Sequence, residues 1–115
     1  MVDLSFLEKF TKGDTRKMKR YIGIFLSIAS ETLSEMREHA LEQDWDPLRI
    51  KAHSLKPQAD YIGVPQLKAV LMEIEQSILD TNFDKIPKLC EKASALYDET
   101  VPFLTAFTES VSEGK

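Results

Sequence analysis

The stretch from Asp14 to Gln43, DTRKMKRYIGIFLSIASETLSEMREHALEQ, decides the fold class of this chain. Its apolar residues recur in steps of three and four, which is the period of an α-helix with one buried face. They are Met18, Tyr21, Ile22, Phe25, Ile28, Ala29, Leu33, Met36 and Ala40. Asp14 is well placed as the N-cap of this helix. The stretch therefore predicts one long amphipathic helix.

The same period recurs on both sides of this stretch. A short helix is expected after Asp3, with apolar residues at Leu4, Phe6, Leu7 and Phe10 and a break at residues 11–13. A third helix is expected to begin with Asp46 as N-cap and Pro47 at its first position, and to bury Leu48, Ala52, Leu55, Ala59 and Ile62. A fourth opens at Pro65 and buries Leu67, Val70, Leu71, Ile74 and Ile78. The last buries Ile86, Leu89, Ala93, Leu96, Tyr97, Val101, Leu104, Phe107 and Val111.

Four amphipathic helices with short connections predict an all-α fold, an antiparallel four-helix bundle with a short additional N-terminal helix. We expect a single domain over residues 1–115. Residues 1–13 form the short N-terminal helix and turn, residues 14–111 the four-helix bundle, and residues 112–115 a frayed tail. A monomer is the simplest expectation.

Composition narrows the classes of function. The chain has a net charge of −4 and a pI near 5.2, which argues against nucleic-acid and anionic-membrane binding unless the basic residues are concentrated in one place. No apolar run approaches the ~20 residues of a membrane span, and the N-terminus does not resemble a signal peptide. The single cysteine, Cys90, is expected to be a small buried hydrophobe. A cytoplasmic location is expected.

The segment Ile50 to Gly63, IKAHSLKPQADYIG, carries the candidate site. On a helical wheel His53 lies roughly 140° from the centre of the buried stripe, so it is predicted to be exposed. Its face also carries Arg49, Lys56 and Asp60, a row that is also common as a solvated charge ladder.

Three apolar residues, Ile50, Pro57 and Tyr61, occupy the most outward part of the same wheel. Exposed apolar side chains at helical spacing beside a histidine indicate a docking surface, unless the first helix covers Tyr61. The other histidine, His39, falls near the edge of its own helix's apolar stripe. It is expected to be a boundary residue with a satisfied hydrogen bond.

Here the sequence resembles a known family. AHSLKPQADYIG, followed by Leu67 and the pair Ile74-Glu75, resembles the signature of histidine-containing phosphotransfer (HPt) domains. Leu7, the break at Gly13 and Asp14, and Phe25 extend the resemblance over most of the chain. It implies that His53 is the phosphoacceptor, that Lys56 stabilises phosphoryl charge, and that Gly63 closes the active helix.

The resemblance also implies the reaction and the partners. His53 would accept a phosphoryl group from a receiver-domain aspartyl-phosphate and pass it to the aspartate of another receiver. Response-regulator receiver domains are the implied partners, and a hybrid sensor histidine kinase is a further candidate. The chain would be a phosphocarrier without autonomous kinase activity. It would bind no cofactor or metal of its own, and Mg²⁺ would be held by the receiver.

One position departs from the usual family pattern. A glycine usually follows the lysine, and this chain has Pro57. Proline has no N–H and presses on the preceding turn, which predicts a local bend or widened turn beginning at His53. Pro102 predicts a kink in the last helix for the same reason.

Two other functions remain open at this stage. The first is a non-catalytic helical-bundle module that binds receiver domains without being phosphorylated, although the presence of both His53 and Lys56 argues against it. The second is a metal-bearing bundle enzyme. A di-iron bundle needs paired Glu-x-x-His motifs, whereas this chain has none and contains two histidines in all.

Overall fold

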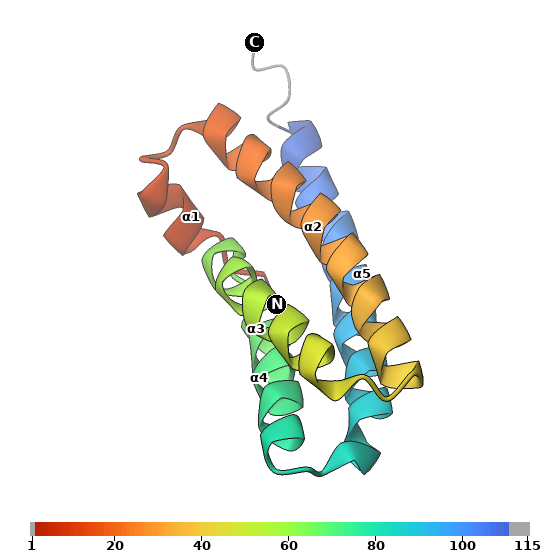
Figure 1. Cartoon of the computed structure of the whole chain (residues 1–115). Coiled ribbons are helices and arrows are strands. Elements are labelled where there is room, and N and C mark those ends of the chain that lie inside the picture. The colour runs from red at the N-terminus through yellow and green to blue at the C-terminus, as the bar shows by residue number, and fades with distance from the viewer. Residues whose placement is uncertain (1, 111–115) are drawn as a thin grey trace.

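The computed structural model describes residues 2–110, which form five α-helices and a short 3-10 turn (Figure 1). The helices are α1 (Ser5–Phe10), α2 (Thr15–Leu41), α3 (Trp45–Ile62), α4 (Pro65–Leu79) and α5 (Ile86–Ser110), and the 3-10 turn is Phe83–Lys85. The predicted burial of Val111 and the predicted frayed tail at residues 112–115 lie outside the described residues.

Helices α2 to α5 form the predicted all-α antiparallel bundle. α3 packs on α2 and α4, and α5 packs on the same two helices, so the four form a closed ring (Figure 1). α1 contacts α3 and lies beside the end of the bundle where α2 begins (Figure 1). The bundle is elongated, with principal extents of 49 × 21 × 20 Å. The predicted fold class is confirmed.

The core contains most of the residues that the period of the sequence selects, although Leu96, Tyr97, Val101 and Phe107 of α5 are half-buried. In α3 the five residues predicted to be buried are all buried, namely Leu48, Ala52, Leu55, Ala59 and Ile62. The prediction for α4 holds equally well. On α2 one member of the predicted stripe is wrong, because Ile28 is 39% exposed. Ile24, one turn earlier, is also exposed.

The beginning of α3 differs from the prediction. The helix begins at Trp45, with Asp44 at the N-cap position, so Pro47 falls at the third position. The Trp45 ring stacks on Phe83, with ring centroids 4.6 Å apart, and both side chains pack against the core. This packing holds Trp45 in the first helical turn. The Asp14 cap of α2 is confirmed, since its carboxylate accepts a hydrogen bond from the Lys17 N–H at 3.1 Å.

Gly63 ends α3 in a conformation that needs glycine. Its φ is +88°, in the left-handed region. Its carbonyl accepts a hydrogen bond from the Asp3 N–H at 2.7 Å, and a Cβ on Gly63 would lie 1.7 Å from the Asp3 carbonyl oxygen. The N-terminal segment therefore approaches the end of α3 too closely for any side chain.

The prolines do not interrupt their helices. α3 is α-helical on both sides of Pro57, and α5 is α-helical on both sides of Pro102. The widened turn predicted at His53 is therefore not seen, whereas the bend at Pro57 and the kink at Pro102 stay predictions. None of the described helices is long and apolar enough to cross a bilayer.

Candidate functional site

His53 lies in the middle of α3, on the side of the helix away from the core. The helical period places Ala52 and Leu55 in the core, where both are fully buried. The same period turns His53 outward. The His53 side chain is 68% exposed. The predicted exposure is correct, so a large partner can reach the imidazole.

A glutamate on the neighbouring helix holds the imidazole. Glu75, on α4, places its Oε2 atom 2.8 Å from Nδ1 of His53. An ionised carboxylate only accepts hydrogen bonds, so Nδ1 must be the protonated ring nitrogen. The other nitrogen, Nε2, then keeps its lone pair. The contact therefore selects the tautomer whose free nitrogen can act as a nucleophile.

Lys56 completes a three-residue cluster. Its Nζ atom lies 2.5 Å from the other carboxylate oxygen of Glu75, Oε1. Glu75 is thus shared between His53 and Lys56, and its side chain is 14% exposed. Burial alone would raise the pKa of Glu75, but hydrogen bonds from Lys56 and His53 outweigh it and hold that pKa below its ordinary value of 4.5. The carboxylate is therefore ionised across the physiological range.

Two predicted charged residues near His53 have other partners. The Arg49 guanidinium pairs with Asp46 at 3.0 Å, within the first turns of α3. Asp60 forms an ion pair with Lys68 on α4, with 3.3 Å between Oδ1 and Nζ. Both residues lie on α3 as predicted, but among the described residues neither forms an ion pair with the His53–Glu75–Lys56 cluster.

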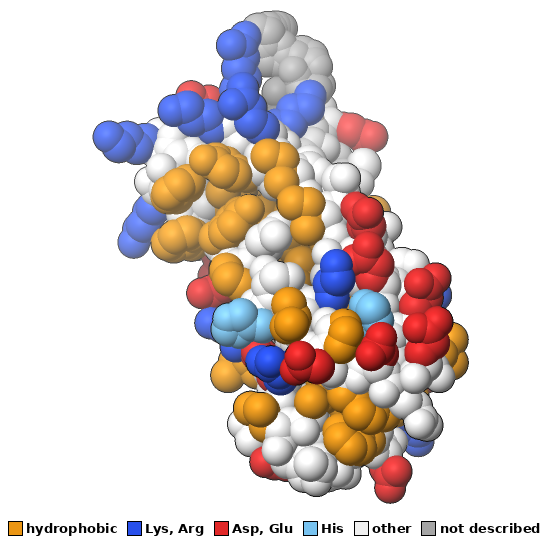
Figure 2. Space-filling view, in the orientation of Figure 1, with side chains coloured by type: hydrophobic (Ala, Val, Ile, Leu, Met, Phe, Trp, Pro, Cys, Tyr) orange, Lys and Arg blue, Asp and Glu red, His pale blue; other side chains and the backbone are white. Residues whose placement is uncertain are grey.

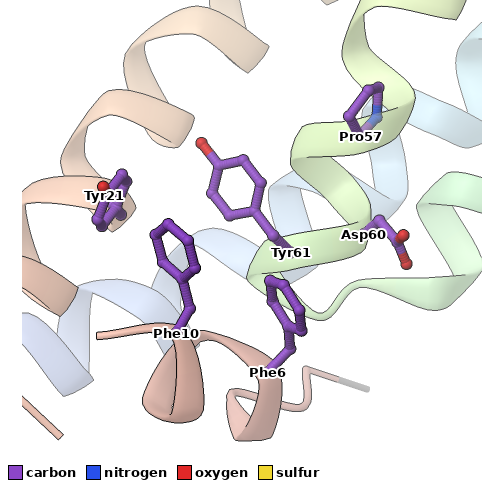
Figure 3. A pocket seen from close by; sticks show the side chains of 6 residues that line it. All are labelled: Phe6, Phe10, Tyr21, Pro57, Asp60 and Tyr61. Atoms are coloured by element: carbon purple, nitrogen blue, oxygen red, sulfur yellow. The ribbon is translucent and has the colours of Figure 1, made fainter. Parts of the chain in front are cut away.

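The predicted apolar docking residues are exposed to different degrees. Ile50 is 54% exposed, and Pro57 is also exposed. Tyr61 is half-buried, with its ring edge-on to Tyr21 of α2 at a centroid distance of 6.0 Å. The alternative, that the first helix covers Tyr61, is not settled by this geometry, because α1 and Tyr61 border one open hollow (Figure 3).

Glu75 is the site residue to which sequence reasoning assigned no role. Its signal was its place in the pair Ile74-Glu75 of the family resemblance, one helix after the histidine. The helical wheel of α3 cannot identify it, because the contact joins residues 22 positions apart on two helices.

A second histidine-containing group lies at the connection between α2 and α3. Among the described residues, His39, Glu42 and Asp44 are the one group of three potential metal ligands. The Nδ1 atom of His39 lies 3.7 Å from Asp44, too far for a hydrogen bond, and has no other partner. The hydrogen bond predicted for His39 is therefore not made at Nδ1. Glu42 and Asp44 are both exposed.

Comparison with known proteins gives one finding. A family model described as the Hpt domain matches residues 20–110, from early in α2 to the end of α5. The match includes His53, Lys56 and Glu75. No curated protein and no solved structure matches the chain.

Proposed function

This chain belongs to the Hpt domain family, whose members carry out histidine phosphotransfer in phosphorelays, and from that premise we propose that His53 is its phosphoacceptor. The phosphoryl group comes from the aspartyl-phosphate of one receiver domain and goes to the aspartate of another. The observation that carries this proposal is the exposed imidazole with Nδ1 bound to Glu75.

The proposed step is a displacement at phosphorus. The Nε2 lone pair forms the N–P bond while the bond between phosphorus and the aspartate oxygen breaks, and the aspartate leaves as a carboxylate. The imidazole becomes positively charged as the N–P bond forms, and the Glu75 carboxylate on Nδ1 stabilises that charge. In the reverse direction an aspartate of the second receiver attacks the same phosphorus, and Nε2 leaves.

Lys56 supplies positive charge beside this reaction. Its ammonium lies one helical turn from His53 and is held by Glu75. A flexible four-carbon stem lets the ammonium move toward phosphoryl oxygens as they gather charge. We propose that Mg²⁺ is contributed by the receiver, and that the chain is a phosphocarrier without kinase activity of its own.

The receiver must dock directly over His53. Ile50, one turn before the histidine, and Pro57, one turn after it, are exposed apolar residues that flank it along α3. We propose that they form the apolar part of the docking surface, together with the exposed edge of Tyr61. Arg49 and Asp60, paired within the chain, lie at its margins.

The decisive experiment incubates the chain with a phosphorylated receiver domain and looks for phosphohistidine, which is labile in acid. The parent and His39→Gln should gain the acid-labile phosphoryl group, and His53→Gln should not. A chain that binds the receiver but never gains the group would be the non-catalytic interaction module instead. Phosphoryl incorporation by His53→Gln would assign the acceptor to another residue.

A further inference from the structure

An open hollow lies beside the proposed docking surface, where α1, the start of α2 and the end of α3 meet. Its volume is about 420 Å³, and its lining is largely aromatic: Phe6, Phe10, Tyr21, Pro57, Asp60 and Tyr61 (Figure 3). Its charged lining residue, Asp60, is already paired with Lys68. The hollow is therefore an apolar concavity of the size that one or two large side chains can fill.

The aromatic side chains around the hollow are held in place by one another. The rings of Phe6 and Phe10 stack at 6.1 Å, and Phe10 meets Tyr21 edge-on at 5.5 Å. Phe6 and Phe10 are nevertheless 55% and 59% exposed. Exposed aromatic residues in a fixed arrangement are typical of protein docking sites, because little entropy is lost when a partner covers them.

The apolar surface continues from the hollow toward His53. The Tyr21–Tyr61 contact and the Lys51–Glu35 ion pair fix the register of the antiparallel helices α2 and α3. Exposed apolar residues lie between these contacts, Ile24 and Ile28 on α2 and Pro57 on α3. Figure 2 shows hydrophobic side chains extending over this face from the α1 end.

Positive charge surrounds the same end of the molecule. Residues 9–20 contain six basic residues and one acidic residue, which leaves nine basic against eighteen acidic residues for the rest of the chain. All six, Lys9, Lys12, Arg16, Lys17, Lys19 and Arg20, are exposed, and none forms an ion pair with another described residue. Figure 2 shows Lys and Arg side chains above the hydrophobic group.

We propose that this hollow takes an apolar side chain from a receiver domain whose docking surface is acidic, so that the basic end selects among receivers. The inference rests on the proposed function and names the chemistry of its partner. Charge complementarity favours it, since a strongly basic end on an otherwise acidic chain attracts acidic surfaces and repels basic ones. Concavity favours a protein over an anionic membrane, whose surface offers no side chain to fill the hollow.

The test begins with phosphorylated receiver domains from the source genome, and the fastest donor is then used with matched variants. Lys17→Glu/Arg20→Glu should raise the KM for this receiver on the order of tenfold at low salt while leaving the maximal transfer rate unchanged. The increase should shrink at about 1 M salt. Lys88→Glu/Lys92→Glu on α5, which makes the same change in net charge, should behave as the parent.

The hollow is tested separately from the charge. Phe10→Ala should raise the KM by about 5- to 30-fold, because a buried aromatic anchor dominates such interfaces. Leu79→Ala removes an equally exposed apolar side chain at the end of α4, and should have no effect. Phe6→Ala is a second variant of the hollow, and unfolding curves for all variants report whether the bundle is intact.

The outcomes separate this inference from the proposed function. If no receiver transfers phosphate to His53, the proposed function and the inference both fail. Transfer that is insensitive to Lys17→Glu/Arg20→Glu, or to Phe10→Ala, overturns the inference alone. A membrane result also overturns the inference. In that result, phosphatidylserine vesicles bind the parent and compete with the receiver, but they do not bind Lys17→Glu/Arg20→Glu. The site would then be a membrane-binding site.

Discussion

Replacing Glu75 with alanine tests how the site holds the imidazole in its reactive form. In the parent the Glu75 carboxylate accepts from Nδ1 of His53 at 2.8 Å and from Lys56. Alanine removes the acceptor, so the ring can rotate and either nitrogen can carry the proton. Nε2 is then protonated in part of the population, and that part cannot attack phosphorus. Glu75 is thus proposed as a positioning residue.

The size of the effect follows from the contact. A hydrogen bond to a charged group contributes about 1.5–3 kcal/mol, and each ~1.4 kcal/mol changes a rate tenfold, which sets an upper range of about 10- to 150-fold. The imidazole is 68% exposed, so water competes for Nδ1. We therefore expect a loss near the lower end, about tenfold. Glu75→Gln keeps an amide oxygen that can accept from Nδ1, and should lose less.

The assay is single-turnover transfer from a saturating phosphorylated receiver, so that docking does not enter the rate. Nitrogen NMR of the imidazole reports which ring nitrogen carries the proton, a readout that a purely structural role would not move. Glu73→Ala is the matched control, since Glu73 lies on the same helix and pairs with Lys85 at 3.7 Å, away from His53. Glu75→Ala with a transfer rate within about twofold of the parent, and with Nδ1 still the protonated nitrogen, would refute the reasoning.

The same cluster makes stability depend on pH in a defined direction. The pKa of Glu75 is lower in the folded state than its ordinary value of 4.5. Its ionised form therefore stabilises the fold above that pH, and the contribution is lost as the pH falls through the folded pKa. The parent should be more stable than Glu75→Gln at pH 7, with the difference shrinking below about pH 4.5. Urea unfolding of both proteins at pH 7 and pH 3 measures this, and a constant difference would contradict it.

Four further variants test the rest of the site. His53→Gln should abolish acid-labile phosphoryl incorporation and leave the melting temperature close to that of the parent, because the side chain is exposed; His39→Gln should retain incorporation. Lys56→Ala should slow single-turnover transfer by about 10- to 1000-fold, and a rate within about twofold of the parent would exclude a role in charge stabilisation. Ile50→Glu should weaken receiver binding, measured by titration, far more than it lowers the melting temperature, whereas a large drop would place Ile50 in the core. Pro57→Ala restores a helical N–H donor, and should raise the free energy of unfolding by up to ~3 kcal/mol in urea titrations; a less stable variant would show that the proline fits its turn without strain.

The helical period was enough to predict most of the buried residues. Burial in a bundle depends on the angle of each residue about its own helix axis, and the sequence spacing gives that angle. The buried set of α3 was correct throughout, and so was the exposure of His53. The start of α3 was wrong for a tertiary reason. Asp46 and Pro47 are ordinary signals for a helix start, but stacking of Trp45 on Phe83 extends the helix toward its N-terminus. That stacking joins residues 38 positions apart, and capping rules do not contain it.

Ile28 was misplaced for a related reason. The stripe on α2 is apolar over a wider angle than the bundle covers, so its margin remains exposed. Period alone cannot separate a core margin from a docking face, because both are apolar at the same spacing. Ile24 on this margin lies one turn after Tyr21, which lines the aromatic hollow, and we expect a partner to cover it there.

The contact between His53 and Glu75 could not be predicted from either helix alone, because it depends on how α3 and α4 are placed relative to each other. The period of α3 turns His53 away from the core, and the period of α4 places Glu75 at the border of the buried stripe that contains Ile74 and Ile78. Each helix in a four-helix ring has two neighbours, so a side chain outside the buried stripe of α3 leans toward either α2 or α4. Which one it faces depends on the hand in which the ring turns, and the reversed hand would bury much the same residues. The reversed ring would bring His53 toward α2 and leave Glu75 without its two partners. The hand of the bundle, set by connections and side-chain packing across all four helices, therefore decides whether His53 meets Glu75.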